Sequence, residues 1–115
     1  MFDFQKLEVY KKAKHFHVEC KKIILSRDLD KYVIDQLGRA SFSIPLNIAE
    51  GSGKFSKADR RNFFVIARAS VFECIAILDI LLDDSKVTES EMKELMVDAD
   101  ELSRILFAMI KNLSI

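Results

Sequence analysis

Proline and glycine are scarce in this chain of 115 residues, which has one proline, Pro45, and three glycines. Two of the glycines, Gly51 and Gly53, follow the proline closely in the stretch SIPLNIAEGSGK, and Gly38 precedes it. Because these residues interrupt helices, the chain outside this stretch is expected to form long helices. It contains no alternating strand pattern, internal repeat or low-complexity segment.

The chain also has few cysteines. Cys20 and Cys74 are far apart, and each falls within a hydrophobic pattern. We expect buried core thiols of a reducing compartment, because a disulfide framework needs more cysteines at closer spacing.

No long hydrophobic run is free of charge. The most apolar stretch, residues 63–82, is long enough to cross a bilayer, but it contains Arg68, Glu73 and Asp79. Charged side chains are costly in lipid, so this stretch is predicted to be a buried helix. The opening residues MFDFQKLEVYKKAK carry charge where a signal peptide has an apolar segment. We therefore expect a cytoplasmic protein with no membrane partner.

Net charge is absent too, because 18 Lys and Arg residues balance 18 Asp and Glu residues. The protein therefore has no overall attraction to nucleic acid or to membranes. The charges are nevertheless unevenly distributed. Residues 38–68 carry six basic and two acidic side chains, whereas residues 79–101 carry two lysines and nine acids. Basic residues therefore predominate in the earlier of these two segments and acidic residues in the later one.

Hydrophobic residues recur at steps of three and four in four segments, a pattern typical of helices. The recurring positions are Val9, Ala13, Phe16, Cys20 and Ile23; Ile34, Leu37, Ser41, Ile44 and Ile48; Phe63, Ala67, Ser70, Cys74, Ile77 and Leu81; and Met92, Leu95, Ala99, Leu102, Leu106, Met109 and Leu113. The predicted fold is all-α, an up-down-up-down four-helix bundle in one domain over residues 1–115. The expected N-terminal caps are Asp3, Asp30, Ser56 with Asp59, and Thr88 with Glu91.

The third helical segment carries a second apolar line beside the first. This line consists of Phe64, Val71, Leu78 and Leu82. A bundle core needs only one face of each helix, so a helix that is apolar on two faces indicates burial on two sides. We predict that Phe64, Val71 and Leu78 form a subunit interface. The alternative interpretation is a wide core inside a single subunit.

The stretch around the proline predicts a bend and an end for the second helix. Pro45 cannot donate a backbone hydrogen bond and its ring crowds the preceding turn, so the helix should kink there. Gly51 is expected to adopt the left-handed conformation that ends a helix, and Gly53 to let the chain turn.

Glu50 needs a separate explanation, because an acidic side chain at the C-terminal end of a helix opposes the helix dipole. We expect it to have a specific basic partner. The two candidates are Arg39 on the same helix and Arg68 on the next.

The stretch QLGRASFSIPLNIAEGSGKFSKADRRNFFVIARASVFECI resembles the core of the four-helix-bundle proteins encoded by intervening sequences of bacterial 23S rRNA genes. The start, FDFQKLEVYKKA, resembles the start of the same family, and the likeness covers roughly residues 2–112. The combination of SIPLNIAEG, Ser56, IARAS and Glu73 is the specific part of the match.

The resemblance implies a small cytoplasmic bundle that assembles into a cyclic homo-oligomer, commonly a pentamer. The accessory protein of diversity-generating retroelements is similar in fold and binds a reverse transcriptase and nucleic acid, so the resemblance implies partners of these two kinds. The matching positions are expected to be structural, and they are Asn47, Glu50, Gly51, Arg68 and Glu73. The family often has a basic pair where this chain has Gly38 and Arg39, which adds Arg39 to the expected nucleic-acid surface.

A basic cluster follows the glycines. Lys54, Lys57, Arg60 and Arg61 lie where a loop meets the start of a helix, and the backbone N–H groups of a helix start favour phosphate. The first function hypothesis is binding of an RNA or DNA backbone, and the family resemblance is what places it first. From the charge pattern alone, an ordinary solvated face is the favoured explanation of the cluster.

The second hypothesis is a protein–protein scaffold that does not touch nucleic acid. An enzyme is not expected, and neither a cofactor nor a metal site is predicted. Carboxylates recur along one side of the fourth helical segment, but they lack a matching acidic pair on a second helix and are expected to be solvated. These carboxylates belong to Glu91, Glu94, Asp98 and Glu101.

Overall fold

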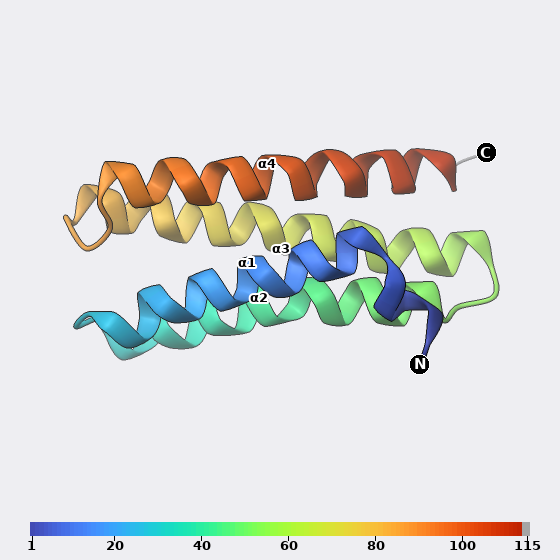
Figure 1. Cartoon of the computed structure of the whole chain (residues 1–115), viewed down its shortest axis with the longest axis horizontal. Coiled ribbons are helices and arrows are strands. Elements are labelled where there is room, and N and C mark those ends of the chain that lie inside the picture. Colours follow the sequence, from blue (N-terminus) through green and yellow to red (C-terminus); the bar gives the residue numbers. More distant parts are fainter. Residues whose placement is uncertain (114–115) are drawn as a thin grey trace.

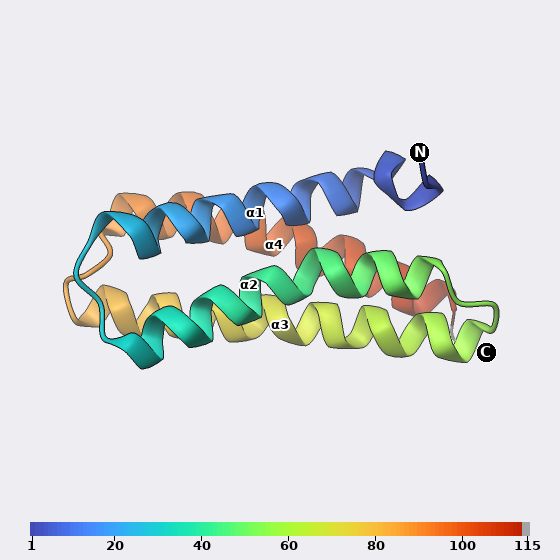
Figure 2. The same cartoon turned by 90° about the horizontal axis from the view of Figure 1, so that it is seen from below.

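The chain forms four long helices, shown in Figure 1 as a computed structural model that describes residues 1–113. The elements in order are a short 3-10 turn η1 (Asp3–Lys6), α1 (Glu8–Ser26), α2 (Lys31–Ser52), α3 (Lys57–Asp83) and α4 (Glu89–Asn112). Consecutive helices alternate in direction and pack side by side, and α1 also contacts α4 (Figures 1 and 2). This confirms the all-α class and is consistent with the up-down-up-down order. Residues 114–115 of the predicted domain lie outside the described residues.

Side-chain caps start α3 and α4 as predicted. The Ser56 hydroxyl accepts a hydrogen bond from the Asp59 backbone N–H at 3.0 Å, and Thr88 forms a full capping box with Glu91. Asp30 occupies the N-cap of α2 without a side-chain hydrogen bond. The prediction for Asp3 is wrong, because Asp3 begins η1 and the N-cap of α1 is Leu7.

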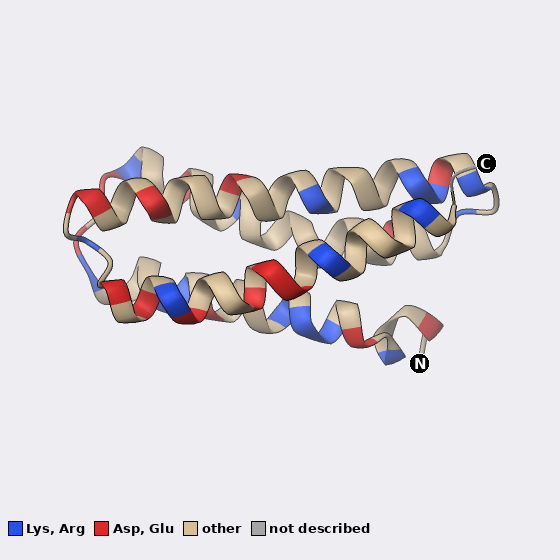
Figure 3. Cartoon of the chain, turned by 90° about the horizontal axis from the view of Figure 1, so that it is seen from above, with Lys and Arg blue, Asp and Glu red and all other residues tan. Residues whose placement is uncertain are grey.

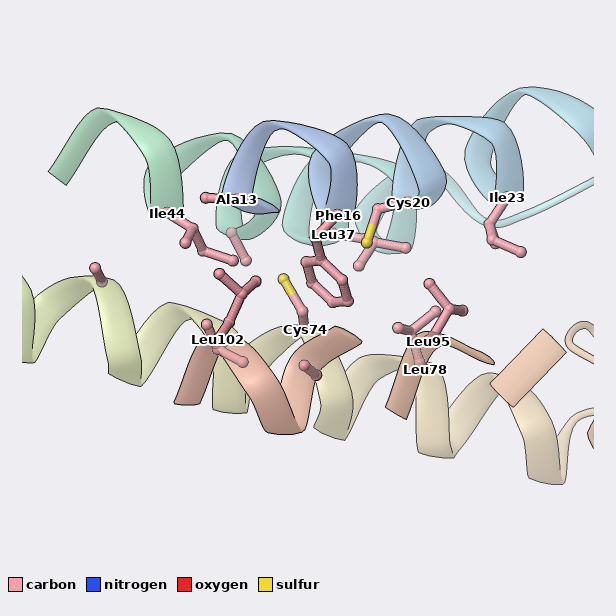
Figure 4. Close-up of a cluster of buried hydrophobic side chains, with 14 of the residues drawn as sticks. Ala13, Phe16, Cys20, Ile23, Leu37, Ile44, Cys74, Leu78, Leu95 and Leu102 are labelled. Carbon is pink, nitrogen blue, oxygen red and sulfur yellow. The ribbon is translucent and has the colours of Figure 1, made fainter. Parts of the chain in front are cut away.

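The core lies along the axis of the bundle and receives side chains from all four helices (Figure 4). All five predicted positions of α1 are buried, and Phe16 is among the largest fully buried side chains. Cys20 and Cys74 are buried and free, as predicted. The neighbouring Cys20 thiol and burial both raise the pKa of the Cys74 thiol far above its ordinary value, so Cys74 stays protonated and acts as a core side chain.

Most residues of both apolar lines of α3 lie inside the subunit, and Phe63, Ile77 and Leu82 are half-buried. Phe64, Val71 and Leu78 are 5%, 1% and 0% exposed, so the prediction that they form a subunit interface is wrong. The physical reason is that α3 packs against α2 on one side and α4 on the other. Its buried face is therefore wide enough for both lines, and the alternative of a wide core within one subunit holds for these residues.

Pro45 lies inside α2 and is buried. Helical structure continues on both sides of it, from Lys31 to Ser52. The bend at Pro45 stays a prediction.

An ion pair closes the end of the bundle where α1 joins α2. Both guanidinium Nη atoms of Arg27 donate to the Glu91 carboxylate at 2.9 Å, and Nη1 also donates to the Lys86 carbonyl at 2.9 Å. The Arg27 guanidinium and the Thr88 N–H lower the pKa of Glu91 to about 2. Because this pair links the α1–α2 loop to the start of α4, it connects segments distant in sequence.

We predict that stability falls as the pH drops from about 4.5 toward 2. The pKa of Glu91 is depressed in the folded state, so its contribution is complete above the unfolded value and is lost on protonation. Partial solvent exposure reduces the contribution to roughly 1–2 kcal/mol. Urea denaturation at pH 6 and pH 3 measures the free energy of unfolding. This free energy should fall less between the two pH values for Glu91→Gln than for the wild-type chain. Equal falls in the two proteins would contradict the role of Glu91 in this pH dependence.

Candidate nucleic-acid interface

Four predicted cationic side chains gather at the end of the molecule where α2 joins α3. The basic end, as we call this group, consists of Lys54, Lys57, Arg60 and Arg61. Arg61 is half-buried and the other three are exposed. Figure 3 shows blue ribbon in this loop and in the first turns of α3. The structure therefore brings these four predicted residues to one place.

Hydrogen bonds to both flanking helices hold the backbone of the connecting loop in place. The Gly53 N–H donates to the Glu50 carbonyl at 3.1 Å, and the Lys54 N–H donates to the Gly51 carbonyl at 3.2 Å. From the other side, Arg60 Nε donates to the Lys54 carbonyl at 2.6 Å. The loop therefore presents its side chains from an ordered backbone.

The charges of the basic end are not neutralised within the described chain. Among residues 1–113, none of its four side chains forms an ion pair with a carboxylate, although Asp59 lies in the same helical turn. The Lys54 ammonium lies 5.1 Å from the centre of the Phe63 ring. The positive end of the α3 dipole adds to these charges, so the basic end suits an anion such as phosphate.

Arg39 does not join this group. It is exposed in the first half of α2, about 20 Å before the end of that helix at a rise of 1.5 Å per residue. A ligand that contacts both Arg39 and the basic end therefore has to extend along α2.

Polar side chains fasten α2 to α3 near the proline. The amide Nδ2 of Asn47 donates to the Ser43 carbonyl at 2.8 Å and lies 3.2 Å from the Ser43 hydroxyl. That hydroxyl is hydrogen-bonded to the Ser70 hydroxyl across the interface at 2.6 Å. Asn47 therefore completes a hydrogen-bonded contact between the two helices.

Gly51 does not end α2, contrary to the prediction. It lies within the helix without a positive φ, and Gly53 is the C-cap with φ of −89°. A Cβ atom on Gly51 would lie 2.7 Å from Cε1 of Phe64 and 3.0 Å from Cβ of Phe63. Glycine is required at position 51 because α3 approaches the backbone of α2 too closely for a side chain.

Glu50 does not pair with either predicted partner. It is exposed, and within residues 1–113 neither Arg39 nor Arg68 forms an ion pair with it. The expectation fails because Arg68 points to another surface, where its Nε donates to the Ser103 carbonyl of α4 at 3.2 Å.

Arg68 lies in an apolar groove between α3 and α4. Its guanidinium carbon is 4.8 Å from the ring centre of Phe72 and 5.4 Å from that of Phe107. Val65, Phe72 and Phe107 are 46%, 57% and 54% exposed, and the groove has a volume of about 450 Å³. We call Val65, Arg68, Phe72 and Phe107 the α3–α4 apolar face. Sequence reasoning missed this set, although the excess of apolar residues in residues 63–82 was its signal.

Glu73 lies in the second half of α3, away from the basic end. It lines a pocket of about 430 Å³ between the start of α2 and the end of α3. The lining of this pocket combines apolar side chains such as Leu29, Val33 and Ile77 with four carboxylates and one lysine, Lys86. The Glu73 side chain is exposed, and its pocket includes no residue of the basic end.

The row of carboxylates on α4 is partly paired with α1. Glu101 forms an ion pair with Lys12, and Asp98 lies 3.8 Å from Nε2 of His15. Within residues 1–113, no three His, Cys, Asp or Glu side chains are grouped so that they could hold a metal ion. The same described residues include no helix with the length and hydrophobicity needed to span a bilayer.

These features define the class as a small all-α protein, a bundle of four helices with the basic end at its α2–α3 loop. The model of the 23S rRNA-intervening sequence protein family matches residues 5–108, and the chain belongs to this family. A crystal structure described as a protein with unknown function from the S23 ribosomal protein family of Bacteroides thetaiotaomicron is similar, with a TM-score of 0.83 and 25% identity. The alignment covers 90% of this chain and 98% of that one. No curated protein matches.

We predict opposite effects of alanine at two glycines of α2. Gly51→Ala should destabilise the protein by about 1–3 kcal/mol, because its Cβ would overlap Phe64. Gly38→Ala should stabilise it by about 0.5–1 kcal/mol, since the nearest atom to its Cβ is Cδ1 of Ile24 at 3.7 Å. Urea denaturation at one protein concentration measures both changes. Gly51→Ala with wild-type stability would contradict the close approach of α3.

Proposed function

We propose that this protein is a non-enzymatic, homo-oligomeric bundle of the cytoplasm whose basic end binds the sugar–phosphate backbone of RNA or DNA. The observation that supports this most is the set of unpaired cations in an ordered loop and helix start. Lysine and arginine side chains that lack internal carboxylate partners need not break an ion pair to bind phosphate.

Backbone binding fits the balance of charges in this chain. A protein with no net charge has no long-range attraction to nucleic acid, so its affinity has to come from a local group. Four cations per subunit give a weak site with a strong dependence on salt concentration. In a cyclic oligomer the site repeats around the ring, and a long nucleic acid that contacts several copies binds more tightly through multivalency.

Charge reversal provides the test. Arg60→Glu with Arg61→Glu should weaken binding of a labelled RNA or DNA oligonucleotide by at least about tenfold in 50 mM salt. The slope of log K against log salt concentration should become shallower for this variant, because fewer counterions are released. Fluorescence anisotropy measures both quantities.

A matched control separates the local site from the total charge. Lys31→Glu with Lys93→Glu alters the net charge equally, and both lysines are exposed at the opposite end of the bundle. This control variant should bind like the wild-type chain. If both double variants lose affinity equally, or if neither does, the basic end is not the binding site.

The oligomer in this proposal is a ring, with five subunits by resemblance to the family. The α3–α4 apolar face is the surface that a second copy is proposed to cover, in place of the buried residues predicted from the sequence. Exposed Val65, Phe72 and Phe107 bring apolar area together around Arg68, and such a face is stabilised when a partner removes it from water.

Light scattering should give a particle several times heavier than the chain mass of 13.2 kDa. Phe72→Asp, which places a charge on the α3–α4 apolar face, should reduce the mass to that of one chain. Phe42→Asp is the control, because Phe42 is 52% exposed on α2, away from this face, and its substitution should leave the mass unchanged. If the wild-type protein has the mass of one chain at micromolar concentration, the proposed cyclic oligomer is overturned.

A second candidate function is a scaffold that binds proteins and not nucleic acid, for example as an accessory to a reverse transcriptase. The observation that favours it is again the α3–α4 apolar face, where the guanidinium of Arg68 lies between two aromatic rings without a carboxylate partner among residues 1–113. Arginine and aromatic side chains together are typical of protein interfaces. A chain that binds neither RNA nor DNA in low salt would favour the scaffold.

A further inference from the structure

Phe55 is the most exposed of the large hydrophobic side chains that the structure describes. Its relative exposure is 104%, so its ring is as open to solvent as in an extended peptide. Burying a phenyl ring stabilises a folded protein by about 2–3 kcal/mol, and Phe55 does not contribute this stabilisation. Among residues 1–113 the ring has no aromatic partner.

The position of this ring is fixed by its neighbours along the chain. On one side, Lys54 is tied to Gly51 through its N–H and to Arg60 through its carbonyl. On the other side, Ser56 caps α3 through its bond to the Asp59 N–H. Phe55 therefore projects from between two anchored residues, which limits the entropy lost when its ring stacks on a ligand.

Basic residues lie next to Phe55 along the chain. Lys54 and Lys57 flank it in sequence, Arg60 and Arg61 follow on the first turns of α3, and the Asp59 carboxylate is the opposing charge within residues 53–62. An open aromatic face among unpaired cations matches the chemistry of a nucleotide, which has a flat base and an anionic phosphate.

We infer that the basic end binds single-stranded nucleic acid, with the Phe55 ring stacked on a base while the surrounding cations contact phosphates. This inference rests on the proposed nucleic-acid-binding function and adds the strandedness of the ligand. In a duplex the faces of internal bases are covered by their neighbours, so Phe55 has no base to stack on and only the phosphates are accessible. Any base can stack, so little sequence preference is expected.

The test compares a 15-nucleotide oligo-dT with a 15-base-pair duplex by fluorescence anisotropy in the same low-salt buffer. Phe55→Ala and Phe55→Leu should bind the single strand about 5- to 150-fold more weakly, the equivalent of 1–3 kcal/mol for one stacked base. Phe55→Tyr, which keeps an aromatic face, should retain affinity within about twofold. Affinity for the duplex should be the same in all four proteins.

The outcomes distinguish a failure of the stacking inference from a failure of the proposed nucleic-acid-binding function. If Phe55→Ala binds oligo-dT like the wild-type chain while the Arg60→Glu, Arg61→Glu variant does not, the stacking role is overturned and backbone binding stands. Equal losses on single strand and duplex would also overturn it. If the wild-type chain binds neither oligonucleotide, both proposals fail. A fall in oligomer mass with Phe55→Ala would also overturn the stacking role, and would assign the Phe55 side chain to a contact between subunits.

Discussion

The close packing of α2 against α3 is the contact on which the candidate site depends. Gly51 lets the backbone of α2 approach Phe64, and the hydroxyls of Ser43 and Ser70 join the two helices further along. This contact brings the end of α2 and the start of α3 together, so a few residues suffice to connect them. The short loop then concentrates Lys54 and its neighbours at one end of the bundle.

Helix α3 combines three roles that the fold assigns to different parts of its surface. One wide face fills the core, the first turns carry the cations, and the outer side toward α4 exposes the α3–α4 apolar face. The same helix therefore connects a proposed ligand site with a proposed subunit contact. In the proposed ring, cyclic symmetry would place the basic ends of all copies at one level, where they would act together on a long ligand.

Much of the fold could be predicted from the sequence because helix periodicity and capping are local properties. The five buried positions of α1 and the capping box at Thr88 follow from residues three or four apart. The failures involve contacts between helices. Spacing alone could not show that Phe64 faces α2 or that Gly51 is needed for close approach, nor that Arg68 packs against Phe107 on α4 and not near Glu50. The grouping of the basic end followed from its short sequence span, whereas the openness of Phe55 required the structure.

The most direct test of this account is to locate where nucleic acid touches the protein. Ultraviolet cross-linking of the wild-type protein to a thymine- or uracil-containing single strand, followed by mass spectrometry of the peptides, maps the contact without any substitution. The account predicts cross-links within residues 51–64, centred on the loop between α2 and α3. Cross-links confined to α1 or α4, with none in this loop, would contradict it.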